Sequence, residues 1–193
     1  MENYEKETIA AIATALSDSG IGIVRISGEN AIYIVDSIFR SASGKKILTK
    51  VQSHMIHYGY IVDKDENIID EVMTSVMKAP KSYTMEDTVE INCHGGVLVM
   101  QKVLETVLQA GARLAEPGEF TKRAFLNGRI DLSRAEAVID VIHSQNEYAL
   151  SSSVSQLKGR LSDKIRSLRE DILYQIAFIE SALDDPEHIS LEG

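Results

Sequence analysis

The chain has 193 residues, with 20 Lys and Arg against 29 Asp and Glu, and therefore a formal net charge of −9 at pH 7. Its 44% hydrophobic and 25% charged residues are typical of a soluble globular protein of one domain, or of one domain with an appendage. No apolar run approaches the roughly 18 residues that a membrane-spanning helix needs, and the N-terminus is acidic where a signal peptide is basic. A single cysteine excludes an internal disulfide and favours a reduced, cytoplasmic setting, while the acidic balance argues against independent tight binding to nucleic acid.

Strand patterns and helical patterns alternate up to about Ala115. Runs rich in Ile and Val that flank turn residues predict hairpins, and apolar residues at helical spacing predict amphipathic helices. The predicted elements, in chain order, are a hairpin of 8–14 and 21–26, a helix at 31–39, a hairpin of 54–62 and 68–77, a strand at 88–93 and a helix at 97–110. This alternation predicts an α+β domain over residues 1–116.

From Pro117 onward almost every segment favours helix. A short helix is predicted at 119–126, where an Asn-Gly pair follows it. Ser133 and Glu136 have the spacing of a capping box, which predicts that the next helix begins there and runs to about His143.

The last predicted element is one very long helix over 150–183. Apolar residues spaced by threes and fours form a seam along it, and Gly159 inside it costs about 1 kcal/mol relative to Ala. So long a seam needs partner helices, and one short preceding helix cannot supply them. We therefore predict that residues 117–193 are an all-α segment of an incomplete bundle, cut near Gly193.

The sequence His94-Gly95-Gly96 lies where a predicted strand ends and a helix begins. Exposed backbone N–H groups at such a junction can dock an anion, but the glycines can equally serve only to permit a tight turn. Cys93 precedes His94, and neighbours on a strand point to opposite faces, so the two cannot form a nucleophile and base pair.

Arg25 is a charged residue in an otherwise apolar predicted strand. A half-buried guanidinium needs a partner, and two interpretations are equally supported: an internal ion pair, with Glu90 as a candidate, or contact with an anionic ligand. Glu90 lies on the predicted strand beside the glycine turn. Its carboxylate could accept two parallel N–H bonds from an amidine-like edge, such as the aminopyrimidinone part of a pterin.

Other candidate groups indicate no catalytic or metal site. His54 and His57 face opposite sides of a predicted strand, and no acidic or thiol cluster completes a metal site. A basic stretch on the long helix could follow RNA phosphates, although a solvated bundle face is the simpler interpretation; it contains Lys158, Arg160, Lys164, Arg166 and Arg169. No phosphate-binding loop of the G-x-x-x-x-G-K-[ST] type is present, so we expect no GTP hydrolysis by these residues.

Three stretches taken together resemble the MnmE (TrmE) tRNA modification GTPase family. They are Thr8 to Thr14 with Gly22-Ile23-Val24-Arg25-Ile26-Ser27-Gly28; Ser82-Tyr83-Thr84 with Glu86-Asp87 and Cys93-His94-Gly95-Gly96; and Pro117 to Gly128, PGEFTKRAFLNG, with Asp131-Leu132 and Ala135-Glu136-Ala137. The third is the most specific, and together they cover nearly the whole chain in order. Met85 stands where the family pattern has Gly, and Arg129 where Lys is common.

The resemblance implies a fold and an activity for the parent protein. The family has an N-terminal α+β domain like the folate-binding domain of aminomethyltransferases, then a helical domain with a Ras-like G domain inserted into it. With an FAD-dependent partner, MnmG (GidA), such proteins add a (carboxymethyl)aminomethyl group to C5 of the wobble uridine of tRNA. GTP, K+ and Mg2+ would be bound only by the G domain, which these residues lack.

The resemblance also implies what this part does alone. The N-terminal domain would form a homodimer and bind a 5-formyl-tetrahydrofolate-type one-carbon donor, whose contacts by motif position are Arg25, Glu90 and Arg129. His94, Gly95 and Gly96 would form a wall of that pocket. Two alternatives stay open: a purely structural dimerisation module with a vestigial pocket, and a stand-alone folate-dependent aminomethyltransferase.

Overall fold

The computed structural model describes residues 7–184, in two compact units that divide between Arg129 and Ile130. The first unit is α+β and the second is all helical, which confirms the predicted fold class. The division falls later than the boundary predicted between residues 116 and 117. The reason is that the short helix α3 (Glu119–Leu126) is joined to the first unit by ion pairs.

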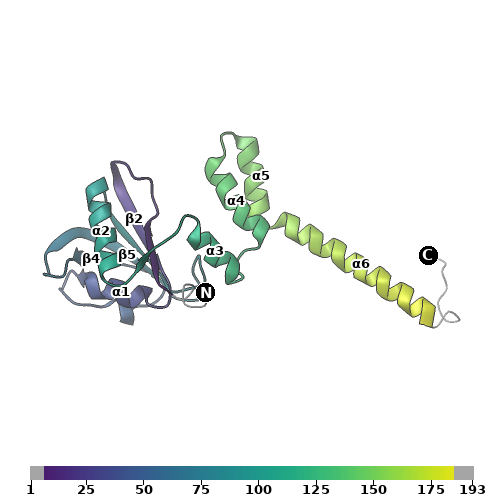
Figure 1. The fold of residues 1–193 in the computed structure, drawn as a ribbon, viewed down its shortest axis with the longest axis horizontal. Helices are drawn as coiled ribbons and strands as arrows, with labels where there is room; N and C mark the ends of the chain where they lie inside the picture. Colours follow the sequence, from purple (N-terminus) through teal and green to yellow (C-terminus); the bar gives the residue numbers. More distant parts are fainter. Residues whose placement is uncertain (1–6, 185–193) are drawn as a thin grey trace. The chain divides into compact units, whose positions relative to one another are not determined.

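A seven-stranded sheet forms the centre of the first unit, with strand order β3-β4-β5-β6-β2-β1-β7 (Figure 1). All neighbours are antiparallel except β1 and β7, which are parallel. The strands are β1 (Ile9–Ile12), β2 (Ser19–Ser27), β3 (Phe39–Ser41), β4 (Met55–Val62), β5 (Ile68–Met77), β6 (Thr88–Gly95) and β7 (Arg113–Leu114). Both predicted hairpins, β1–β2 and β4–β5, are thereby confirmed.

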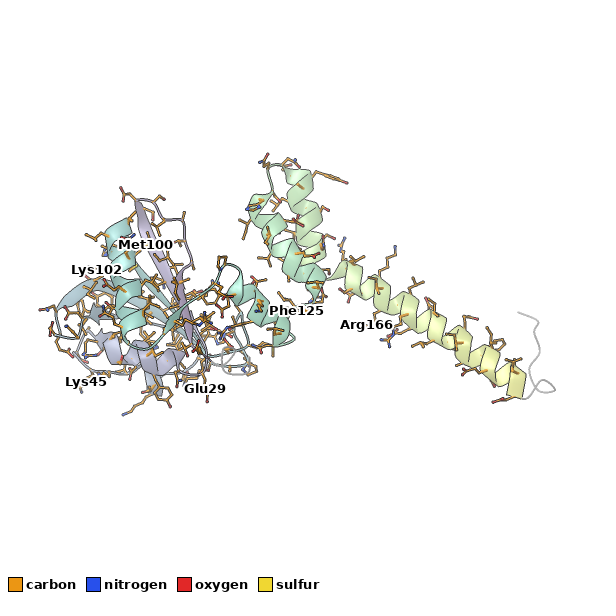
Figure 2. The ribbon with its side chains drawn as sticks, in the orientation of Figure 1. Glu29, Lys45, Met100, Lys102, Phe125 and Arg166 are labelled. Atoms are coloured by element: carbon orange, nitrogen blue, oxygen red, sulfur yellow. The ribbon has the colours of Figure 1, made fainter. Side chains whose placement is uncertain are left out.

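Two helices cover one face of this sheet, α1 (Ala31–Ile38) and α2 (Val97–Gln109), as predicted (Figure 1). A turn of 3-10 helix, η2 (Leu48–Lys50), packs beside α1. The core lies between helices and sheet, and Met100 of α2 is fully buried there (Figure 2). Its side chain occupies the space that a Cβ at Gly22 of β2 would need, so the glycine permits close contact between α2 and β2.

The opposite sheet face is open and carries apolar side chains. Along β6, Val89, Ile91 and Cys93 are buried, while the alternate residues Glu90 and Asn92 are only half-buried. Strand register places Ile56 of β4, Ser75 of β5, Glu90 of β6 and Arg25 of β2 in one row across this face. The adjoining row contains Tyr58 and Met73, and Ile56, Tyr58 and Met73 are 65%, 49% and 47% exposed. We call these three residues the open-face patch.

The second unit begins with a helical hairpin of α4 (Leu132–His143) and α5 (Glu147–Leu157). The predicted capping box of Ser133 and Glu136 is wrong. The carboxylate of Asp131 caps α4 instead, since it accepts a hydrogen bond from the backbone N–H of Arg134 at 2.9 Å. The Ser133 hydroxyl donates to the same carboxylate from within the first turn.

The prediction of a single long helix is also wrong, because the helix is interrupted at Gly159. This residue has a φ of 85°, which ends α5 before α6 (Arg160–Asp184) begins. A Cβ at this position would collide with the guanidinium of Arg134. Ser162 of α6 donates a hydrogen bond of 2.6 Å to Asp131, so the N-terminus of α4 and the break are tied together.

The apolar seam of α6 is not buried by any described residue. Its exposed members are Leu161, Ile165, Leu168, Ile172, Ile176, Ile179 and Leu183. Across residues 7–184, none of the helices combines the length and apolar character that crossing a membrane requires.

Candidate ligand-binding site

Arg25 and Glu90 form a cross-strand ion pair between β2 and β6. The Arg25 Nε and Nη2 atoms each lie 2.8 Å from Glu90 Oε1, and 29% and 22% of the two side chains remain exposed. The ion-pair interpretation of Arg25 is thus confirmed. Both contacts fall on Oε1, and Oε2 accepts no hydrogen bond from the described part of the chain. The free oxygen and the partial exposure leave this carboxylate able to accept a ligand N–H group.

Two aromatic rings lie against Arg25. Its Cζ atom is 5.6 Å from the ring centroid of Tyr83, in the loop before β6, and 5.6 Å from that of Phe120 in α3. The Cζ atom of Arg129 lies 4.9 Å from the same Tyr83 ring. These distances are those of cation–π contacts. Tyr83 therefore connects Arg25 and Arg129, which are far apart in sequence.

The end of α3 places Arg129. Asn127 ends the helix and Gly128 follows with a φ of 77°, so the chain turns sharply. The Gly128 N–H donates to the Phe125 carbonyl and the Arg129 N–H to the Ala124 carbonyl, at 3.0 and 2.9 Å. This is the pattern of a Schellman motif, and it explains why an Asn-Gly pair precedes the arginine.

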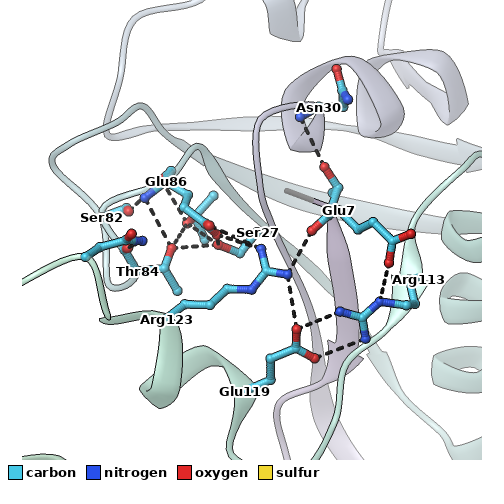
Figure 3. A network of polar contacts seen from close by, with 12 residues as sticks. Glu7, Ser27, Asn30, Ser82, Thr84, Glu86, Arg113, Glu119 and Arg123 are labelled. Carbon is cyan, nitrogen blue, oxygen red and sulfur yellow. Dashed lines mark hydrogen bonds and ion pairs between the residues drawn. The ribbon is translucent and has the colours of Figure 1, made fainter. Parts of the chain in front are cut away.

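A buried ion-pair network fixes α3 to the sheet (Figure 3). The guanidinium of Arg123, only 7% exposed, contacts Glu86 and Glu119 and donates to the backbone carbonyl of Glu7. Arg113 binds Glu119 from the other side, with Nη2 2.7 Å from Oε1. Because Glu119 and Arg123 of α3 are held this way, Phe120 of the same helix lies against Arg25 of β2, and Arg129 follows beside Tyr83.

Glu119 is the centre of this network. Burial by itself raises the pKa of its carboxyl, but hydrogen bonds from Arg113, the backbone N–H of Glu116 and Arg123 outweigh it and hold the pKa at about 2. The carboxylate is therefore charged throughout the physiological range. It serves to position α3 and is not available as a proton donor.

An open hollow of about 550 Å³ adjoins Tyr83 and Arg129. Its volume falls within the range of small-molecule sites. The other lining residues are His54, Met77, Pro80, Lys81, Ser82 and Met85. Two of them, His54 and Met85, have φ angles of 64° and 61°, a left-handed conformation that costs a non-glycine residue about 1 kcal/mol or more.

The His94-Gly95-Gly96 segment lies elsewhere on β6. His94 is four residues along the strand from Glu90, or about 13 Å, and its Nδ1 atom lies 2.7 Å from Asp70 Oδ1. This pairing with Asp70 raises the pKa of His94. A Cβ at Gly95 would collide with Ser19 of β2, and Gly96 precedes the first turn of α2. Close packing against Ser19 therefore explains the glycine at position 95, and the turn into α2 explains the glycine at position 96.

The remaining candidates show no catalytic arrangement. Cys93 is buried, burial raises the pKa of its thiol to about 11, and its Sγ donates to the Gly22 carbonyl. A thiol with this pKa is a poor nucleophile. Within residues 7–184, no group of three or more His, Cys, Asp and Glu side chains is placed to hold a metal ion.

The sequence reasoning did not assign roles to Tyr83, Phe120 or Arg123. Neither Tyr83 nor Phe120 lies in a periodic pattern that fixes the direction of its side chain. The available signal was charge: Arg123 and Glu119 are spaced i, i+4 in α3, which brings the two onto one helix face.

Comparisons with known proteins match both units. A family model described as "GTP-binding protein TrmE N-terminus" matches residues 8–129, and one described as "MnmE helical domain" matches residues 132–192. A protein of Lachnoclostridium phytofermentans is 65% identical over 187 residues, and one of Geobacillus kaustophilus is 56% identical over 189. One of Bacillus subtilis is 52% identical over 187 residues. Each is named "tRNA modification GTPase MnmE".

The alignments cover 96–97% of this chain but only 40–41% of those three relatives. The chain therefore spans about two fifths of the length of the curated relatives it matches.

Proposed function

Because the chain belongs to the MnmE family of tRNA modification GTPases, we propose that it is the folate-binding, dimer-forming N-terminal part of such an enzyme. The observation that carries the proposal is that Tyr83 lies against both Arg129 and Arg25, and that Arg25 in turn pairs with Glu90. The ligand would be 5-formyl-tetrahydrofolate or a related reduced folate.

Each residue suits one part of that ligand. The free Oε2 of Glu90 can accept an N–H group from the aminopyrimidinone edge of the pterin. Arg25 fixes the position of the Glu90 carboxylate through the ion pair, and it can also contact a ligand carbonyl. Arg129 has no carboxylate partner among residues 7–184, so its guanidinium can take a carboxylate of the folate.

The whole-protein activity is also part of the proposal. With the FAD-dependent partner MnmG (GidA), the parent enzyme would add a (carboxymethyl)aminomethyl group to C5 of the wobble uridine of tRNA, in the cytoplasm. GTP, K+ and Mg2+ would be bound by a G domain in the three fifths of the relatives' length that this chain does not span. The folate site would supply the one-carbon unit.

The open-face patch supports the homodimer. Ile56, Tyr58 and Met73 are exposed apolar side chains on one sheet face, and a patch of this kind is typical of a protein interface. Ile56 shares a row with Glu90 and Arg25, so a partner copy on this face would lie beside the ligand site. The dimer and folate proposals therefore use adjoining surfaces.

A structural module with a vestigial pocket is the second candidate. The Arg25–Glu90 ion pair favours this candidate, because each side chain already has an oppositely charged partner within the protein and does not require a ligand. A stand-alone aminomethyltransferase has less support, since it would not account for the match to the MnmE helical domain.

Isothermal titration with 5-formyl-tetrahydrofolate tests the proposal. Arg25→Ala and Glu90→Ala are each expected to weaken binding by about 1 to 3 kcal/mol, roughly fivefold to 150-fold, because each removes a charged hydrogen-bonding group. Lys45→Ala, in the exposed turn after β3, is the matched control and should bind as the wild type does. Circular dichroism verifies that each variant is folded.

The outcomes separate the candidates. Wild-type affinity in both Arg25→Ala and Glu90→Ala would refute the assignment of these residues. A wild-type chain that binds no folate but dimerises would favour the structural module.

A further inference from the structure

The hollow beside Arg129 has a cationic lining. Its two cationic side chains are Lys81 and Arg129, and its lining includes no acidic residue. The whole chain carries a formal charge of −9, so a pocket without a carboxylate departs from the general charge balance. A ligand group drawn to it would be anionic.

Neither cation is neutralised by the protein itself. In the region from Glu7 to Asp184, neither Lys81 nor Arg129 forms an ion pair, and the Arg129 guanidinium lies against the Tyr83 ring. The nearby carboxylates are engaged elsewhere: Asp87 accepts from the backbone N–H of Ala79 at 2.8 Å, and Glu86 binds Arg123. The positive charge therefore remains available to a ligand.

Tyr83 lines the hollow and also contacts Arg25 of the proposed pterin site. Its ring lies 5.6 Å from the guanidinium carbon of Arg25 and 4.9 Å from that of Arg129. Its hydroxyl hydrogen-bonds Thr121 at 3.0 Å, which fixes the ring. A ligand held at Glu90 and extended across Tyr83 would enter the hollow that Arg129 and Lys81 line.

We propose that this hollow binds the poly-γ-glutamate tail of reduced folates, so that the site prefers polyglutamylated ligands over the monoglutamate. The inference rests on the proposed folate function and deepens it. Each γ-linked glutamate adds one α-carboxylate. Arg129 can bind a carboxylate through two parallel N–H bonds, and Lys81 provides a second, point-like charge for the next one. A monoglutamate presents its α- and γ-carboxylates on one residue, which we assign to Arg129, and the carboxylates that further glutamates add are assigned to Lys81.

The test compares 5-formyl-tetrahydrofolate monoglutamate and pentaglutamate by isothermal titration at low and high salt. For the wild type, the pentaglutamate should bind at least about fivefold more tightly at low salt, and the difference should shrink as salt is added. Lys81→Ala should lose most of this preference while keeping the monoglutamate affinity. Lys81→Glu should reverse it, and Lys45→Ala should leave it unchanged.

The failures are distinguishable. If the monoglutamate does not bind the wild type, the folate function itself fails. If the monoglutamate binds and the pentaglutamate binds no more tightly, or if Lys81→Ala keeps the preference, the tail assignment is overturned while the folate function stands. A short single-stranded RNA that binds in a Lys81-dependent manner, with no gain from glutamate length, would also overturn it and assign the hollow to RNA phosphates.

Discussion

At the scale of single residues, Met85 is held in a left-handed conformation with a φ of 61°. Glycine adopts this conformation without steric cost, whereas a residue with a Cβ does not. Met85→Gly should therefore be more stable than Met85→Ala, by about 1 kcal/mol, in urea unfolding followed by circular dichroism. At Lys102, inside α2 (Figure 2), the order should invert, with Gly less stable than Ala by about 1 kcal/mol. If the Gly variant were less stable than the Ala variant at both positions, the strain inferred at Met85 would be contradicted.

His94 gives a pH-dependent prediction. The hydrogen bond and charge of Asp70 raise the pKa of His94 above 6.5 in the folded state. A raised pKa means that the folded state binds the proton more tightly, so the added stability is present below pH 6.5 and is lost as the pH rises through the folded pKa. In a titration followed by NMR, Asp70→Asn should lower the pKa of His94 toward 6.5. A wild-type pKa of 6.5 or below would contradict the pairing.

At the scale of elements, Gly159 separates α5 from α6, and we predict that Gly159→Ala destabilises the helical unit. The substitution meets two costs: the left-handed φ of 85° and a collision with Arg134. The expected loss is about 2 kcal/mol, measured by urea unfolding. Gly44→Ala is the matched control, because Gly44 has a φ of 74° but open space around it, and it should lose only about 1 kcal/mol. Equal losses would show that Arg134 does not pack against Gly159.

Sequence patterns predicted β1, β2, β4, β5, β6, α1 and α2, because one face of each is buried, as in β6, where Val89, Ile91 and Cys93 alternate with half-buried residues. They did not predict the short strands β3 and β7, which have only three and two residues. The patterns also predicted one uninterrupted helix through Gly159, where the structure has two. Leu157 and Leu161 keep the seam in phase across the break, so periodicity carries no sign of it, and the local backbone decides. The Arg25–Glu90 pair was foreseeable, since a charge in an apolar strand needs a partner. The convergence of Tyr83 and Arg129 was not, because a loop and a helix end meet only in the folded chain.

At the scale of the whole molecule, the open-face patch is the proposed dimer surface. Met73→Lys would place a charge in that interface without an obvious partner, and it should raise the dimer dissociation constant at least about tenfold in analytical ultracentrifugation. Leu98→Lys is the control, since Leu98 is 69% exposed on α2, on the opposite side of the sheet. A wild-type monomer at micromolar concentration, or equal effects of both substitutions, would refute the use of this face.

We propose above that one ligand spans Glu90, Tyr83 and Arg129, and a crystal structure of the chain soaked with 5-formyl-tetrahydrofolate would show whether it does. The aminopyrimidinone edge is expected within hydrogen-bonding distance of Glu90, and the glutamate carboxylates are expected against Arg129. A folate bound elsewhere on the chain, or bound here with its pterin remote from Glu90, would contradict it.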